Sequence, residues 1–475
     1  MFHVDIPVSV GIMGMKSSSA MRKEMIVLKN KQVNMLSGSI TKGLLAMTMP
    51  IMIMNVTQNL FSIIDMTILG QFAGDDAVGS VGACSMLITL CTCLLIGIAA
   101  GANIVVAKRI GAQDRARTKK AADTAIILAL AGGLLLLIIG TIFAETFLQW
   151  INCPKSLLTD AVLYFRIYFY GAPFLMLYNF AAAILRAVGD TKRPMYFLLF
   201  SGGVKVLLNL VFIKLLNMDV DGVGIATLIS NILASTLCIL ALRRSNLQFR
   251  FRKMQFSTQE MGDILHLGVP TGLQSAFYAF ANVIIATAVN SFGPEATTGI
   301  SIANQIDGVM YYIACAPSLA TAPYVAQNVG AHNFPRVKKV VISSIFITVA
   351  FGGILGALFS VFADELASII TSSPTVIAYA KQKIVLVSAT YFICGINEVM
   401  SGTLRGLGKP IVPTISVLVF MCLFRFVWVY GIFPLAPNLT FLYLVWPIGW
   451  ILSIATLLIA YFPTIRRLQT QYPTS

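Results

Sequence analysis

The sequence contains few charged residues. Only 11% of its 475 residues are Asp, Glu, Lys or Arg, whereas 57% are hydrophobic. A soluble globule of this length needs many more polar side chains to cover its surface. The composition therefore excludes an ordinary soluble protein and indicates a polytopic membrane protein in a lipid bilayer. The net charge of +15 then reflects basic loops beside membrane segments, and we expect no nucleic-acid partner.

Several sequence motifs of catalysis and metal binding are absent. The chain has only three histidines, and its eight cysteines lie mainly in apolar runs without CxxC spacing. It has no GxxxxGK[ST] phosphate loop, no HExxH motif and no Ser/His set at one depth. These absences argue against a metalloenzyme, an ATPase, an intramembrane enzyme or a receptor. We expect a protein that is not an enzyme and holds no cofactor.

The hydrophobic residues fall into twelve long runs bounded by charge, Gly or Pro. Because a helix of about 20 residues crosses the hydrocarbon core, each run predicts a membrane span. The expected spans are 44–72, 78–107, 121–149, 157–185, 194–216, 221–242, 263–292, 297–327, 340–362, 376–404, 411–432 and 440–463.

Most of the 34 basic residues lie in the tails and in every second loop. The other loops carry mainly acidic residues, with Lys155 as an exception. The positive-inside rule therefore predicts cytoplasmic termini in a multi-pass plasma-membrane protein. We expect residues 1–43 to be a disordered cytoplasmic tail whose true translation start is open, 244–262 a cytoplasmic linker, and 464–475 a second cytoplasmic tail.

The chain repeats itself. The sequence at residues 185–189, LRAVG, returns 219 positions later at 404–408 as LRGLG, and Gly111-Ala112 returns as Gly330-Ala331. Such a repeat is typical of membrane transporters. Because each copy has an even number of spans, both enter from the same side. The predicted fold is an all-α polytopic membrane protein with twelve transmembrane helices in two homologous six-helix bundles, 44–243 and 263–463, related by a pseudo-two-fold axis along the membrane normal.

Ionisable residues at membrane depth are functional candidates because burying them there is unfavourable. In the first half, Asp65, Asn209 and Thr227 fall in one layer, as judged from their distance to the outer helix ends. Their oxygens suit Na⁺, or the Asp65 carboxylate could carry a proton. Alternatively, Asp65 forms a structural ion pair with Lys205.

The second half has different polar residues at its repeated positions. Glu398 corresponds to Asn179, and Arg425 to Asn209. We expect a substrate cavity bordered by Glu398, Arg425, Asp307, Asn179 and Lys205. An Asp307–Arg425 pair is one arrangement, and structural roles for Glu398 or Arg425 are the alternative. Pro50 and Pro270 open corresponding helices. They predict hinges there, or else are ordinary membrane prolines.

The TM1 segment from Asn59 to Gly70 and the repeated Leu-Arg-x-x-Gly, followed by Lys and Pro, resemble the multidrug and toxic compound extrusion family. The likeness runs from about 41 to 465. It implies a V-shaped pair of bundles that exports amphipathic organic cations in exchange for Na⁺ or H⁺. In one branch of that family the cation site resembles Asp65, Asn209 and Thr227, with Ile213 here replacing a second carboxylate. In the other branch, Tyr278 and Cys394 stand where Glu and Asp are expected, and Glu398 is the nearest substitute.

Two transport functions fit these patterns. The first is a monomeric secondary exporter of organic cations, with Asp65 as the coupling residue for H⁺ or Na⁺ and with Asp65, Asn209 and Thr227 as metal ligands only if the ion is Na⁺. The second is a flippase of lipids or lipid-linked oligosaccharides, a class that usually lines its cavity with cations. Lys205 and Arg425 keep this alternative open.

Overall fold

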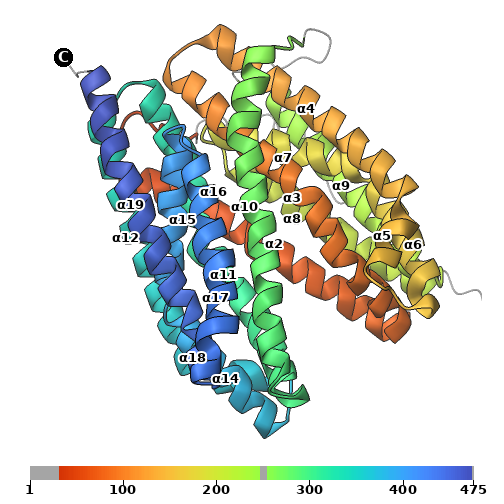
Figure 1. Cartoon of the computed structure of the whole chain (residues 1–475). Coiled ribbons are helices and arrows are strands. Elements are labelled where there is room, and N and C mark those ends of the chain that lie inside the picture. The colour runs from red at the N-terminus through yellow and green to blue at the C-terminus, as the bar shows by residue number, and fades with distance from the viewer. Residues whose placement is uncertain (1–31, 246–253, 473–475) are drawn as a thin grey trace, which may run out of the picture.

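The computed structural model describes residues 32–245 and 254–472, which form helices and connecting turns without a β-strand. Figure 1 shows two groups of helices that converge at the end where the C-terminus lies and diverge toward the other end. Both described chain ends lie at the convergent end, since Val33 N–H donates to the carbonyl of Gly189 and the His332 ring stacks on that of Tyr472. The arrangement is the V-shaped pair of bundles that the sequence predicts.

The first half supplies six membrane spans. Two of them consist of two helices each. The bent pair α6–α7 forms the span expected at 157–185, and the short helix α5 continues α4 in the span expected at 121–149. The elements are α2 (Ile40–Phe72), α3 (Asp75–Gly111), α4 (Arg115–Ile142), α5 (Ala144–Trp150), α6 (Lys155–Tyr170), α7 (Ala172–Ala187), α8 (Lys192–Leu210) with a π-helical extension (Val211–Leu215), and α9 (Val220–Arg243).

The second half repeats this order, with more π-helical turns near its end. Its elements are α10 (Thr258–Asn290), α11 (Pro294–Gly330), α12 (Phe334–Val361), α13 (Ala363–Ser368), α14 (Pro374–Ser388), α15 (Tyr391–Gly406), α16 (Ile411–Val417), a π-helical segment (Leu418–Leu423), α17 (Phe424–Val427), a second π-helical segment (Trp428–Ile432), a 3₁₀ turn (Phe433–Leu435), α18 (Leu439–Tyr443) and α19 (Val445–Gln471).

The predicted duplication is confirmed by matching helices. Helices α2 and α10 have 33 residues each, α3 and α11 have 37, and α4 and α12 have 28. The bent pairs α6–α7 and α14–α15 both turn by 46°. Even the left-handed backbone positions recur at the 219-residue spacing. Gly74 and Gly293 precede α3 and α11 with φ of 89° and 94°, and Gln113 and His332 follow these helices with φ of 56° and 55°.

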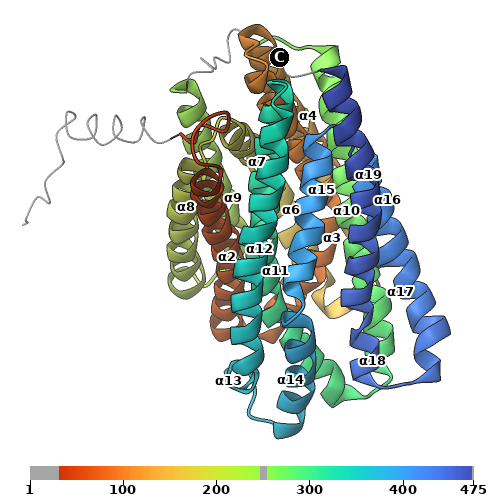
Figure 2. The same ribbon diagram turned by 90° about the vertical axis from the view of Figure 1, so that its left-hand side faces the viewer.

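Eleven of the twelve spans satisfy length and hydropathy criteria for crossing a membrane. Nine described helices pass alone, and the two bent pairs bring the number to eleven. The remaining span is α11, which carries Asp307, Pro317 and Pro323. It tolerates these residues because it packs between other helices, and nearly every residue from Ala314 to Gly330 is buried. Figure 2 shows α11 behind α12 and beside α15.

The two halves meet through small residues at the convergent end. A Cβ atom added to Gly97 would lie 2.2 Å from the backbone of Gly272, and one on Gly111 would lie 1.9 Å from the carbonyl oxygen of Gln327. A Cβ on Gly330 would lie 2.1 Å from the carbonyl oxygen of Lys108. These contacts bring α3 against α10 and α11 with their backbones nearly touching, as glycine permits. The convergent end is therefore closed, and we call it the closed end.

The tails and the linker differ from the sequence expectations where the structure describes them. Residues 1–31 lie outside the described part, but 32–39 pack against the closed end and α2 starts at Ile40, so the expected disorder does not extend to residue 43. Met35 is fully buried. Helix α10 starts at Thr258, inside the expected linker, because Ser257 caps it, and α19 continues through the expected tail to Gln471.

Candidate functional site

The first cavity lies within the first half and holds about 410 Å³. Its lining combines aromatic and small polar side chains with two ionisable residues, Asp65 of α2 and Lys205 of α8. Thr227 of α9 also lines it. Three separate helices thus contribute to one chamber, in which Asp65 and Thr227 are lining residues, whereas Asn209 is absent from the described lining.

Asp65 is held by two side chains of α8. Lys205 forms an ion pair with Oδ2 of Asp65, and the Asn209 amide donates to Oδ1 at 2.7 Å. Lys205 and Asn209 are four residues apart, so one helical face presents both groups to the carboxylate. The Asp65–Lys205 ion pair, which the sequence offered as the alternative to a coupling-ion site, is therefore present, and Asn209 shares the same carboxylate.

A sodium ion fits this arrangement poorly. The Lys205 ammonium already neutralises the carboxylate, and the Thr227 hydroxyl donates instead to the carbonyl of Val223 at 2.8 Å. The carbonyl oxygen of Asn209 is buried without a hydrogen-bond partner and is one free oxygen ligand. Among the described residues, no group of three or more His, Cys, Asp or Glu could hold a metal. Na⁺ normally needs several oxygen ligands, which this arrangement does not offer among the described residues.

The second cavity lies within the second half and is larger, about 740 Å³. Its charged lining residues are Asp307 of α11, Lys383 of α14 and Arg425 of α17. Thr89 of α3, a first-half residue, lines both cavities, so the two adjoin at this position.

The cation partner of Asp307 is Lys383, not Arg425. Lys383 Nζ lies 2.8 Å from Asp307 Oδ2, and the Ser388 hydroxyl donates to Oδ1 at 3.3 Å. Arg425 instead donates through Nη1 to Asn282 Oδ1 at 2.9 Å. The expected Asp307–Arg425 pair is thus wrong, because similar depth does not place two side chains on facing helix surfaces.

Two predicted cavity residues lie elsewhere. Glu398 of α15 is buried and accepts a hydrogen bond from the Tyr278 hydroxyl at 3.0 Å, with Arg405 Nη2 4.0 Å away. It is absent from the described lining of either cavity, although Tyr278 itself lines the second one. Asn179 of α7 donates to the carbonyl of Leu175 in its own helix and lines neither cavity. Glu398 therefore acts on the second cavity only through Tyr278.

The two proline helices are continuous. Pro50 lies inside α2 and Pro270 inside α10, and neither ends its helix. The Thr414 hydroxyl donates to the carbonyl of Pro270 at 2.9 Å. The hinge role stays a prediction, while the sharp bends of the described chain occur between α6 and α7 and between α14 and α15.

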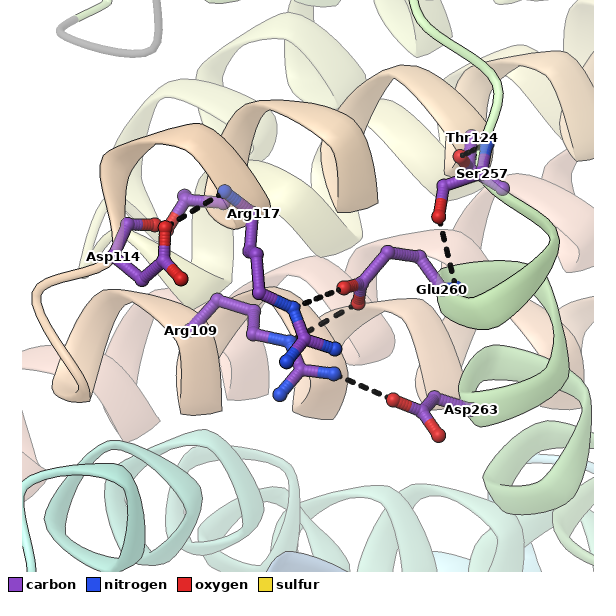
Figure 3. A network of polar contacts seen from close by, with 8 residues as sticks. Arg109, Asp114, Arg117, Thr124, Ser257, Glu260 and Asp263 are labelled. Atoms are coloured by element: carbon purple, nitrogen blue, oxygen red, sulfur yellow. Dashed lines mark hydrogen bonds and ion pairs between the residues drawn. The ribbon is translucent and has the colours of Figure 1, made fainter.

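An ionic network joins the halves at the closed end (Figure 3). Arg109 of α3 donates to Glu260 at 3.1 Å and to Asp263 at 2.5 Å, and Arg117 of α4 donates to Glu260 at 2.8 Å. Both acidic residues lie in the first turns of α10. Because the arginines and carboxylates come from different halves, the network holds the closed end together.

The N-terminal segment adds a second link at this end. Val33 contacts the first half through the Gly189 carbonyl, while Arg336 of α12 donates to the carbonyls of Met35, Ser37 and Gly38. Residues 32–39 therefore bridge the two halves.

Sequence reasoning missed Lys383, Asn304 and Trp446. Lys383 lies near the outer end of the expected span 376–404, where a long cationic side chain can reach water. In the structure its side chain is only 3% exposed, and it donates to Asn304. Its ammonium lies 5.4 Å from the centroid of the Trp446 ring. The sequence feature that could have identified Lys383 is a cationic residue inside a predicted membrane span.

Two helical bundles closed at one end, with a polar cavity in each, are typical of a membrane transporter. The MatE family profile matches residues 50–211 and 270–430, one copy for each half. The chain belongs to the MatE family, whose members are multidrug and toxic compound extrusion transporters and not enzymes.

Known proteins agree with this assignment. The chain is 26% identical to the probable multidrug resistance protein YoeA of Bacillus subtilis over 79% of this chain and 83% of that protein. An outward-facing multidrug resistance MATE transporter of the MOP superfamily superimposes with a TM-score of 0.86 at 21% identity, covering 93% of this chain and 99% of the other. A MOP superfamily transporter from Pyrococcus furiosus, described as having a binding pocket of reverse polarity that suggests a different function, gives 0.83 at 20% identity over 94% and 99%.

Proposed function

We propose that the protein is a secondary active exporter that moves amphipathic organic solutes across the plasma membrane in exchange for protons, with Asp65 as the proton carrier. The observation that carries this proposal is the Asp65–Lys205 ion pair inside the first cavity. The naming of YoeA as a probable multidrug resistance protein supports drug-like solutes. A lipid or oligosaccharide flippase is not favoured, since the relatives are named as multidrug proteins.

The ion pair provides a simple coupling step. A proton that reaches Asp65 from the open side neutralises the carboxylate, so the attraction to Lys205 is lost and α8 is no longer tied to α2. The loss of this tie favours rearrangement of the bundles. One charge moving across 100 mV releases about 2.3 kcal/mol, which suffices to accumulate a solute roughly fifty-fold.

The orientation is part of the proposal. With the basic loops in the cytoplasm, the closed end faces the cytoplasm and both cavities drain outward. We further propose that one chain is sufficient for transport, because each cavity is lined by residues of a single chain.

The test uses the full chain in proteoliposomes, with a pH gradient and a Na⁺ gradient imposed separately. Uptake of two xanthene dyes, the cation rhodamine 123 and the anion 5-carboxyfluorescein, measures transport of either polarity. We expect the pH gradient alone to drive transport of at least one dye, and Asp65→Asn to reduce it more than tenfold. Asp364→Asn, a matched change in an exposed Lys–Asp pair, leaves transport intact. If Asp65→Asn transported normally, or if only Na⁺ drove wild-type transport, the proton mechanism would be excluded.

A further inference from the structure

The second cavity carries more positive than negative charge. Of its described lining residues, Lys383 and Arg425 are cationic and Asp307 alone is anionic. The first cavity, by contrast, is balanced by one Asp and one Lys. Since Asp307 is already engaged with Lys383, the charge of Arg425 remains uncompensated.

Arg425 lacks an acidic partner among the described residues. Its side chain is buried, with the residue 2% exposed, and its hydrogen bond goes to the neutral amide of Asn282. Its Nε atom is buried without a hydrogen-bond acceptor. An unpaired buried cation is unfavourable by several kcal/mol relative to a paired one. A guanidinium kept in this state at a cavity wall is suited to a partner that arrives from outside the protein.

Aromatic rings surround this charge. The guanidinium carbon of Arg425 lies 5.5 Å from the Trp446 ring centroid, and Lys383 lies 5.4 Å from the same centroid. Tyr278, Tyr391 and Trp450 also line the chamber. Cation–π contact stabilises each cation only in part, so both retain attraction for an anion. The rings provide stacking surfaces for a planar solute.

We infer that the second cavity binds an aromatic organic anion, with its carboxylate or sulfonate paired to Arg425 and its ring against the aromatic wall. This inference deepens the proposed exporter function and rests on it. An organic cation is disfavoured because it would face Arg425 and Lys383 in a chamber of low dielectric, while the one carboxylate is already occupied. The expectation of organic cations, which came from the family resemblance, is thereby replaced for this chamber.

Binding is tested separately from transport. Fluorescence polarisation of 5-carboxyfluorescein and rhodamine 123 is measured with the full chain in detergent. We expect the anion to bind at least tenfold tighter than the cation. Arg425→Gln, which keeps the size of the side chain, should weaken anion binding at least tenfold, and Arg425→Lys should restore part of it. Arg166→Gln, at an exposed arginine of α6, is the matched control and should bind like wild type.

The outcomes separate this inference from the proposed function. Tighter binding of rhodamine 123, or anion binding that Arg425→Gln leaves unchanged in a variant that elutes and melts like wild type, overturns the inference. Full displacement of the dye by chloride, at the same concentration of negative charge, also overturns the inference. The site would then bind a small inorganic anion. If the anion binds through Arg425 but neither dye crosses the membrane, the inference stands and the exporter function fails. If rhodamine 123 alone is transported, the exporter stands and the inference fails.

Discussion

The two halves share a backbone plan but surround their ion pairs differently. Asp65–Lys205 borders a small chamber whose described lining holds no third charge, and its side chains are 11% and 17% exposed. Asp307–Lys383 borders the larger chamber, with side chains 6% and 3% exposed, and its neighbour Arg425 has no acidic partner among the described residues. The first pair is therefore electrically isolated, whereas the second holds one cation beside another.

This difference suggests a division of labour after duplication. The repeated helices α2 and α10 have equal length, yet Asp65 is answered in the second copy by Ile285. Equivalent backbones thus carry a carboxylate in one half and an apolar residue in the other. In the function proposed above, the first half serves coupling and the second half holds the solute.

Removing Lys205, the cation paired with Asp65 in the first half, should have the largest effect on the difference between the two halves. In the proposed coupling step, protonation of Asp65 breaks its ion pair with Lys205. The Lys205→Gln variant has no such pair to break, so we expect pH-driven transport to fall about tenfold or more. Removing the ammonium frees Oδ2 of Asp65, and the Asn209 carbonyl oxygen already lacks a partner, so Na⁺ should now stimulate transport. Proteoliposome uptake under separate gradients measures both effects. Unchanged pH-driven transport would remove Lys205 from the coupling step.

The second pair should matter more for stability than for coupling. Asp307→Asn leaves Lys383 buried without a carboxylate beside Arg425, and breaking such a pair destabilises by roughly 3–5 kcal/mol. Asp65→Asn should lower the melting temperature less, because Lys205 is more exposed to its chamber. Thermal unfolding in detergent compares the two variants. The double variant Asp307→Asn with Lys383→Met should recover part of the loss, and equal melting of both single variants would contradict this ranking.

The fold was predictable because its signals are long and repeated. Hydropathy located all twelve spans, and the LRAVG/LRGLG repeat set the duplication. The bends were not visible, since neither 157–185 nor 376–404 shows the 46° turn in its hydropathy. Helix ends were misplaced by a few residues wherever a cap such as Ser257 extends the helix past the apolar run.

The candidate site was predictable only in part, because depth can be estimated from sequence but rotation cannot. The Asp65, Lys205 and Asn209 contact follows from one helix face and one layer. Asp307 and Arg425 share a depth yet have different partners, since the facing surfaces depend on tertiary packing. Lys383 was missed because distance from the end of an apolar run does not reveal helix rotation, which here directs its side chain to Asp307 and Asn304.

The closed end provides a test common to both halves, because both cavities open away from it. Glu260 is almost fully buried and accepts from Arg109 and Arg117, so Glu260→Gln weakens two charged hydrogen bonds, each worth about 1.5–3 kcal/mol. We expect faster hydrogen–deuterium exchange in the first turns of α10 and α4. Asp263→Asn, whose carboxylate is 48% exposed, is the control with a smaller effect. Similar exchange in wild type and Glu260→Gln would show that the glycine contacts alone keep this end closed.

The smallest effect should come from an ion pair of the same chemistry in water. Lys381 lies in α14, the helix that also carries the buried Lys383, and Asp364 lies in α13. The Lys381 ammonium is 2.5 Å from the Asp364 carboxylate, and the two side chains are 50% and 53% exposed. An exposed pair contributes about 0–1 kcal/mol, because water and salt screen it. Asp364→Asn should therefore leave the melting temperature and the dye transport close to wild type, and any small loss should vanish at high salt. A large loss of melting temperature or transport in Asp364→Asn would contradict this expectation. Burial would then not explain why the Asp307–Lys383 pair matters more for stability than the Asp65–Lys205 pair.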